Sequence, residues 1–86
     1  MTPVRQDTYI IRAGTTDAVK IGRSCGPAVR LKYMQANHYE VLSLLRVIEG
    51  DVEEAFHREF AEHRIRGEWF RFVPEMLTFT PSSEAA

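Results

Sequence analysis

A glutamate and a histidine have the types and the spacing of groups that can act on a substrate. Glu53 and His57 are four residues apart, so on a helix they share one face. That face borders the apolar stripe formed by Val52, Phe56 and Phe60. A carboxylate there can hold a divalent cation, and a neutral imidazole can accept or relay a proton. The alternative is an exposed Glu–His pair without a function. When only the spacing is considered, this alternative is favoured over a functional pair.

Three polar side chains of different types are expected to converge nearer the start of the chain. Residues 9–12 and 18–23 are typical of two strands joined by a turn, so Tyr9 and Lys20 are expected to lie level on neighbouring strands. Arg30 lies about one turn into the helix that follows. A phenol, an ammonium and a guanidinium together suit a phosphate diester better than a hydrophobic core. Taken singly, Tyr9 also fits a packing role, and Lys20 fits an edge strand that avoids aggregation.

The charges are unevenly distributed along the chain. Residues 18–33 contain four basic side chains and no acidic one, whereas Asp51, Glu53 and Glu54 form an acidic cluster later. The basic residues are Lys20, Arg23, Arg30 and Lys32. A basic patch beside a small acidic site fits a metal-dependent enzyme acting on a polyanion, and an ordinary solvated surface is the alternative. Gly22, inside a predicted strand, indicates a bulge or the close approach of another backbone or a ligand.

The composition is that of one small globular domain covering residues 1–86. Hydrophobic residues make up 44% and charged residues 27% of the chain, and the net charge is -1 with a pI near 6.3. That charge argues against a bulk electrostatic DNA binder. A single cysteine, Cys25, excludes a disulfide framework or a multi-cysteine zinc site within one chain. We expect a cytoplasmic protein, since no signal peptide and no apolar run of about 18 residues is evident.

The hydrophobic pattern predicts the remaining elements. Residues 27–35 are expected to form a helix that starts at a proline, and residues 41–48 have the β-branched and leucine-rich character of a third strand. Asp51 and Glu54 have the spacing of a capping box, so a second helix is expected from there to about residue 63. The other stretches are expected to be a short strand or an extended plug at 68–72, a weak turn opened by Pro74 and a frayed tail at 80–86.

Taken together, these positions resemble the GIY-YIG endonuclease superfamily, in particular its phage-type branch whose second motif reads Lys-Ile-Gly. The resemblance covers about residues 8–72. Its motifs are the first tyrosine motif at 7–11, the second motif at 20–22, the helix arginine at 30, Glu-x-x-x-His at 53–57 and Arg-x-x-Gly-Glu-Trp-Phe at 64–70. Asp7 and Thr8 replace the usual glycine and isoleucine of the first motif, and Lys20 replaces the usual tyrosine of the second.

The resemblance implies an α+β fold with a small three-stranded, mainly antiparallel sheet flanked by helices. It also implies a DNA endonuclease that hydrolyses phosphodiester bonds with Mg2+ or Mn2+. By position, Glu53 would bind the metal, Tyr9 would act as the base or orient the water, and Arg30 would clamp the scissile phosphate. Lys20 could lower the pKa of Tyr9 or stabilise the developing charge on the phosphate.

Other residues are expected to assist. His57 is a further catalytic candidate, Arg23 and Lys32 are candidates for binding the substrate, and Gly22 and Glu68 would support the site. DNA is the expected partner, no membrane is involved, and a homodimer or a separate specificity partner is possible because 86 residues leave little surface for reading bases.

Two rival functions remain. The first is a catalytically degenerate nucleic-acid-binding module of the same fold. The second is a partner-binding domain that uses Trp69, Phe70 and Phe72 as an exposed contact. The joint presence of Tyr9 and Glu53 with Arg30 and His57 favours the enzyme, because a binding module needs no carboxylate.

Overall fold

The computed structural model describes residues 5–81, which form one five-stranded antiparallel sheet with two α-helices. The strand order is β3-β1-β2-β5-β4. The elements in chain order are β1 (Asp7–Ala13), β2 (Ala18–Ser24), α1 (Pro27–Ala36), β3 (Leu42–Ile48), α2 (Glu53–Glu59), the short 3-10 helix Ala61–His63, β4 (Arg64–Arg66), β5 (Trp69–Arg71) and the 3-10 helix Pro74–Leu77.

The predicted three-stranded sheet is wrong, because β4 and β5 extend it. β5 pairs with the side of β2 that β1 leaves free, with Val19 opposite Phe70 and Lys20 opposite Trp69. This pairing satisfies backbone groups that a three-stranded sheet would leave open on β2, and it buries the Phe70 ring completely. Because β2 is an interior strand, Lys20 is not an edge-strand lysine.

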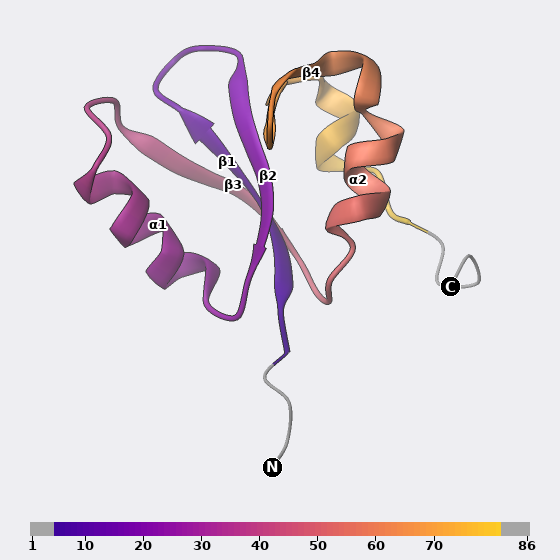
Figure 1. Cartoon of the computed structure of the whole chain (residues 1–86), viewed down its shortest axis with the longest axis horizontal. Coiled ribbons are helices and arrows are strands. Elements are labelled where there is room, and N and C mark those ends of the chain that lie inside the picture. The colour runs from indigo at the N-terminus through magenta and orange to yellow at the C-terminus, as the bar shows by residue number, and fades with distance from the viewer. Residues whose placement is uncertain (1–4, 82–86) are drawn as a thin grey trace.

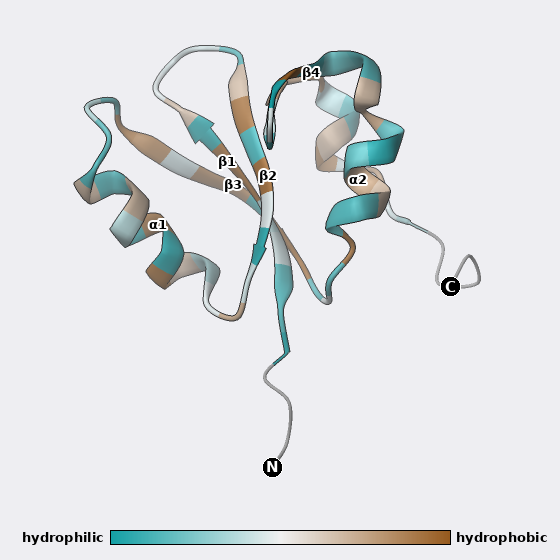
Figure 2. Ribbon diagram, in the orientation of Figure 1, coloured by the Kyte–Doolittle hydropathy of each residue, from teal (hydrophilic) through white to brown (hydrophobic). Residues whose placement is uncertain are grey.

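The two helices cover opposite faces of the sheet (Figure 1). Successive residues of β1 alternate between these faces, so Tyr9 and Ile11 pack on the side of α1 while Ile10 packs on the side of α2. Figure 2 shows hydrophobic residues recurring along β1, β2 and β3, as expected for strands covered on both faces. The larger cluster, on the α2 side, consists of Ile10, Val19, Ile21, Phe56, Phe60, Phe70 and Met76.

The register of the first hairpin differs from the expected one. Tyr9 stands opposite Gly22, and Lys20 stands opposite Ile11. Lys20 and Gly22 are two residues apart on β2, so both face the same side of the sheet as Tyr9. Lys20 is therefore a diagonal neighbour of Tyr9, and the residue level with the tyrosine is a glycine.

The second helix is shorter than expected and is not started by a capping box. It begins at Glu53 after Val52, and no side chain caps its first turn. Asp51 instead accepts a hydrogen bond from Arg23 at 2.6 Å. The local sequence pattern assigned the Asp51 carboxylate to the helix start, but in the structure this carboxylate forms an ion pair with Arg23, which is distant in sequence.

Thr8 fixes the turn that leads into α2. Its buried hydroxyl donates to the carbonyl of Gly50 at 2.9 Å and accepts from the amide of Val52 at 2.8 Å. The neighbouring Asp7 carboxylate accepts from the amide of Gly50 at 2.9 Å. Gly50 has a φ of 91°, which a residue with a side chain rarely adopts. The two residues that depart from the first motif thus anchor the segment that carries Glu53.

The packed part of the chain continues beyond residue 72. Met76 is fully buried, and Phe79 packs edge-on against the rings of Phe56 and Phe60. The guanidinium of Arg46 donates to the carbonyls of Met76 and Phe79, which ties this segment to β3. Most of the expected frayed tail, residues 82–86, lies outside the described residues. Within residues 5–81, the longest helices are too short and too polar to cross a bilayer.

The Thr8 hydroxyl predicts a measurable contribution to stability. Thr8→Val keeps the shape of the side chain but leaves a carbonyl and an amide without partners, which should lower the free energy of unfolding by about 1–3 kcal/mol. Thr78→Val, which removes an exposed hydroxyl, should change it by less than about 0.5 kcal/mol. Urea denaturation of both variants measures the difference, and equal losses would show that the Thr8 contacts contribute nothing specific.

Candidate active site

The hydroxyl of Tyr9 lies against Gly22. A β-carbon on Gly22 would come 2.6 Å from this hydroxyl and 2.8 Å from the ring carbon that carries it, so only glycine fits. The same point lies 3.2 Å from a carboxylate oxygen of Glu68. A bulge, another backbone or a ligand was expected at Gly22, whereas the groups that approach it are side chains of β1 and of the residue that precedes β5.

Burial raises the pKa of Tyr9, whose side chain is 1% exposed. The guanidinium of Arg30 acts in the opposite direction as a hydrogen-bond and charge partner, and the carboxylates of Glu68 and Glu53 raise the pKa further. The net shift is upward, so this phenol is neutral at physiological pH. It can donate a hydrogen bond, whereas a stored phenolate is not favoured.

The positive charge that acts on Tyr9 comes from Arg30, and Lys20 is engaged elsewhere. The ammonium of Lys20 lies 3.8 Å from a carboxylate oxygen of Glu68. The hypothesis that Lys20 lowers the pKa of Tyr9 therefore does not fit, because the pKa is raised and the lysine forms an ion pair with Glu68. In this position Lys20 orients the Glu68 carboxylate beside Gly22.

Arg30 projects from α1 with an exposed side chain. Within residues 5–81, no carboxylate lies within ion-pair distance of its guanidinium. Its partner in the site is the neutral hydroxyl of Tyr9. The planar guanidinium therefore retains donors for an incoming oxyanion such as a phosphate.

Glu53 enters the site from the first turn of α2, and its side chain is 12% exposed. Burial raises the pKa of this carboxyl, and the Glu68 carboxylate raises it further. His57 and Arg23 act in the opposite direction, at 4.0 Å and 3.9 Å from the Glu53 oxygens, without cancelling the shift. The ionised carboxylate is thus short of nearby positive charge, which a bound divalent cation would supply.

Both ring nitrogens of His57 are engaged. One, Nε2, lies 2.8 Å from the carbonyl oxygen of Ile21, and since a carbonyl only accepts, Nε2 carries the proton. The other, Nδ1, faces a donor nitrogen of Arg64 at 3.4 Å. The ring also packs on Phe70. In this arrangement His57 connects α2 to β2.

The two expected substrate-binding cations lie in different places. Arg23 stands at the rim of the site, where it pairs with Asp51 and approaches Glu53. Lys32 is exposed and two residues beyond Arg30, so it projects from nearly the opposite side of α1. The structure therefore brings together Tyr9, Lys20, Gly22, Arg23, Arg30, Glu53, His57 and Glu68, and it leaves Lys32 outside.

The donors available to a metal are the carboxylates of Glu53 and Glu68. Within residues 5–81, no group of three or more histidine, cysteine, aspartate or glutamate side chains forms a closed metal site. Mg2+ commonly binds through one or two carboxylates and completes its coordination with water and substrate phosphate oxygens. These two carboxylates are the groups that would bind such a cation. Sequence reasoning placed Glu68 only in a supporting role, because its closeness to Glu53 depends on the unforeseen pairing of β5 with β2.

The raised pKa of Glu53 predicts an unusual pH dependence of stability. The folded protein holds this proton more tightly than the unfolded chain, so the stabilisation is complete below the unfolded pKa, about 4.3, and is lost as pH rises through the folded value. Glu53→Gln should remove this loss and make the protein more stable than wild type at neutral pH. Thermal melting from pH 4 to 8 measures it, with the exposed Glu54→Gln variant expected to follow the wild-type profile. A Glu53→Gln protein less stable than wild type at neutral pH would contradict this electrostatic picture.

Comparisons with known proteins identify the family. Searches of curated proteins and of solved structures gave no match. The family model of the T5orf172 domain matches residues 8–80, which include every strand and helix of the sheet domain except the first residue of β1. This domain is phage-associated and often linked to nucleases and to a GIY-YIG-like fold. The chain therefore belongs to the T5orf172 domain family.

Proposed function

We propose that this protein is a metal-dependent DNA endonuclease of the GIY-YIG type. The observation that carries the proposal is the convergence of Tyr9, Arg30, Glu53 and Glu68 around Gly22, from two strands, two helices and the turn before β5. Packing alone does not require two carboxylates and a guanidinium around one buried phenol, with the guanidinium free of carboxylate partners among residues 5–81. Groups with shifted pKa values gathered in one place are typical of a catalytic site.

In this proposal Arg30 binds the scissile phosphate. Its guanidinium is free of carboxylate partners within the described residues and can grip two phosphate oxygens at once. The same group can stabilise the negative charge that grows on these oxygens in the transition state. Because Arg30 is close enough to act on the pKa of Tyr9, a phosphate held by its guanidinium would lie near the phenol.

Tyr9 orients the attacking water in this proposal. Because its pKa is raised, the phenol keeps its proton at neutral pH and serves as a hydrogen-bond partner. Lys20 and Glu68 form an ion pair beside it, and this pair sets the position of the Glu68 carboxylate. His57 ties α2 to β2 through its bond to Ile21, so its role is to position the helix that carries Glu53.

Glu53, with Glu68 nearby, would hold Mg2+ or Mn2+. When bound, such an ion polarises the phosphate and stabilises the leaving oxygen. Thr8 and Asp7 keep the Glu53 carboxylate in place by fixing the preceding turn. DNA would be the substrate, and target selection would rest on a second copy of the chain or a separate partner, since this small domain has little surface for reading bases.

Neighbouring glutamates provide a matched test of the nuclease. Glu53→Gln should abolish Mn2+-dependent cleavage of DNA, whereas Glu54→Gln, on the same turn but exposed, should retain it. Mn2+ should also raise the melting temperature of wild type and of Glu54→Gln while leaving Glu53→Gln unchanged. Cleavage assays and thermal melts with and without Mn2+ measure both effects.

The same experiment distinguishes the rival binding module. A module without catalysis would bind DNA equally well in all three proteins, cut it in none and show no response to Mn2+. Loss of cleavage in Glu54→Gln rather than in Glu53→Gln would place the metal ligand one residue further along α2.

A further inference from the structure

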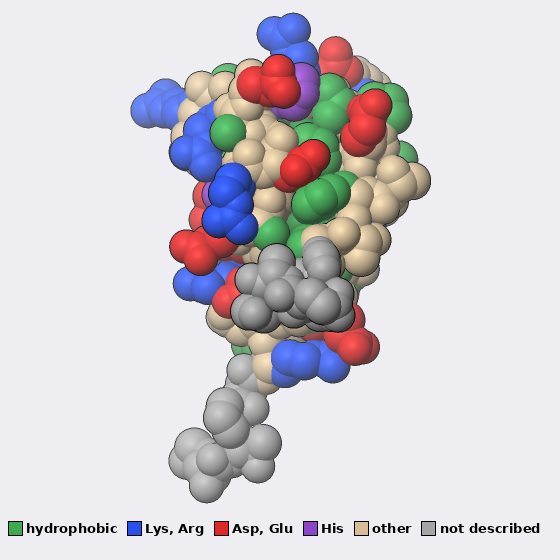
Figure 3. All heavy atoms as spheres, turned by 90° about the vertical axis from the view of Figure 1, so that its right-hand side faces the viewer, with side chains coloured by type: hydrophobic (Ala, Val, Ile, Leu, Met, Phe, Trp, Pro, Cys, Tyr) green, Lys and Arg blue, Asp and Glu red, His purple; other side chains and the backbone are tan. Residues whose placement is uncertain are grey.

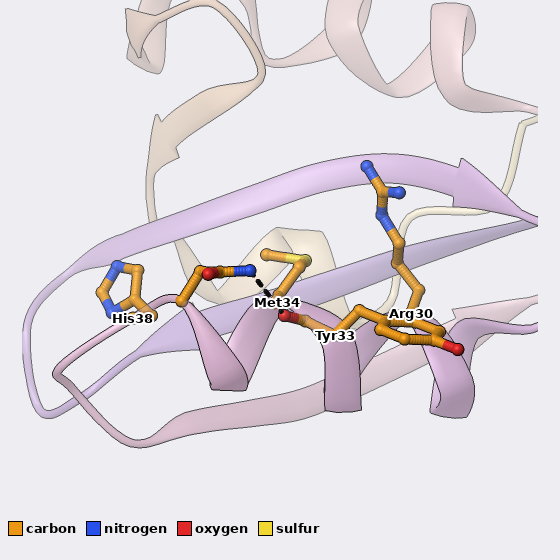
Figure 4. Close-up of a pocket in the computed structure, with 5 residues that line it drawn as sticks. Arg30, Tyr33, Met34 and His38 are labelled. Carbon is orange, nitrogen blue, oxygen red and sulfur yellow. Dashed lines mark hydrogen bonds between the residues drawn. The ribbon is translucent and has the colours of Figure 1, made fainter.

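A groove runs along α1 away from Arg30. Arg30, Tyr33, Met34, Asn37 and His38 line it. Figure 4 shows Arg30 near one end of these residues and His38 at the other, with Met34 between them. Arg30 is also close enough to Tyr9 to act on its pKa, so this end of the groove lies next to the candidate active site.

Aromatic rings lie along this groove and next to one end of it. Tyr33 is 70% exposed and Tyr39 is 95% exposed, although rings of this size usually bury most of their surface. The rings of His38 and Tyr39 are nearly parallel, with an interplanar angle of 8° and centroids 5.7 Å apart. The ring of Trp69 is also near His38, with the two ring centroids 6.3 Å apart and an interplanar angle of 32°. These rings form an aromatic platform, defined here as Tyr33, His38, Tyr39 and Trp69.

Hydrogen bonds hold the loop that carries the platform. The side chain of Gln35 donates to the carbonyls of His38 and Glu40 and accepts from the amide of Leu42. The ring of His38 accepts from the amide of Glu40 at 3.2 Å. The loop between α1 and β3 is therefore fastened to the helix at several points, so little ordering would be needed when a ligand binds.

The charges around the groove favour an anionic ligand. Its lining contains the guanidinium of Arg30 and no carboxylate. The α2 side of the molecule is different, because Figure 3 shows acidic side chains scattered beside the basic ones there. A cationic groove bordered by exposed rings combines the two features with which proteins bind single-stranded nucleic acids.

We infer that the groove along α1 binds unpaired nucleotides that flank the scissile phosphate, with their bases stacked on Tyr33 and Tyr39. This inference rests on the proposed function and narrows its substrate to nucleic acid with a single-stranded segment at the cleavage site. Arg30 would grip a phosphate at the junction, and the bases beyond it would lie on the platform. Bases inside a duplex are already stacked on one another, so they cannot use these rings.

Binding measured without divalent metal tests the groove separately from catalysis. Fluorescence anisotropy in EDTA compares a labelled 15-nucleotide single strand, its duplex and an abasic strand of equal length. The single strand should bind most tightly. Tyr39→Ala and Tyr33→Ala should each weaken its binding by about 5- to 100-fold, the effect of losing one stacked base, and should barely change binding of the abasic strand.

Matched variants separate stacking from other effects. Tyr39→Phe and Tyr33→Phe keep the rings and should bind as wild type does. Ile65→Ala, an exposed apolar position on β4, should also bind normally. Because all these side chains are largely exposed, the variants should melt as wild type does, and the lone tryptophan, Trp69, should change its fluorescence when the single strand binds. An RNA strand of the same sequence is measured beside the DNA strand. The strand that binds more tightly identifies whether the groove prefers ribonucleotides or deoxyribonucleotides.

The outcomes keep the two proposals apart. Equal binding of the single and abasic strands, unchanged by either alanine substitution, would overturn the groove assignment even if wild type cleaves DNA. Tyrosine-dependent binding of the single strand by a protein that never cleaves would support the groove and overturn the nuclease.

Discussion

The hydroxyl of Tyr9 occupies space that a side chain at position 22 would fill, and the candidate site depends on this contact. The antiparallel register of β1 and β2 sets the tyrosine opposite Gly22. With no β-carbon in the way, the buried hydroxyl lies against Gly22, close to the Glu68 carboxylate and near enough to Arg30 for that guanidinium to act on its pKa. Any larger residue at position 22 would displace the ring and disperse the cluster around it.

Electrostatics give the site its second property, which is a deficit of positive charge around its carboxylates. Glu53 is mostly buried near Glu68, while Arg23 and His57 compensate only in part. The ionised form of Glu53 therefore lowers the stability of the fold at neutral pH. Such a loss of stability is common at functional sites, and binding of a cation would restore it.

Much of the fold and site follows from the sequence, and the failures have identifiable physical causes. Periodicity and turn residues predicted the first hairpin, both helices and β3. β5 was expected only as a short strand or an extended plug, without its pairing to β2, and β4 was missed because its three residues are all exposed and too few to show alternation. The capping box failed because Arg23, distant in sequence, pairs with Asp51. Local patterns cannot anticipate such long-range partners.

For the site, residue types predicted the members better than their roles. Tyr9, Arg30 and Glu53 do converge. The ion pair of Lys20 with Glu68 was not predicted, because the position of Glu68 depends on the pairing of β5 with β2. The hydrogen-bond partners of His57 are the carbonyl of Ile21 and the side chain of Arg64, and the motifs that contain these residues do not predict either contact. Strand registers and hydrogen-bond partners depend on the tertiary structure, so the spacing of residues in the sequence could not predict them.

The most direct test of the account removes one oxygen atom. Tyr9→Phe keeps the packed ring and deletes only the hydroxyl, and its cleavage of single-stranded and branched DNA can be compared with that of wild type in Mg2+ or Mn2+. The account predicts metal-dependent cleavage by wild type, its loss in Tyr9→Phe and unchanged DNA binding by both proteins. Wild-type protein that cuts no form of DNA with either metal, or a Tyr9→Phe variant as active as wild type, would contradict it.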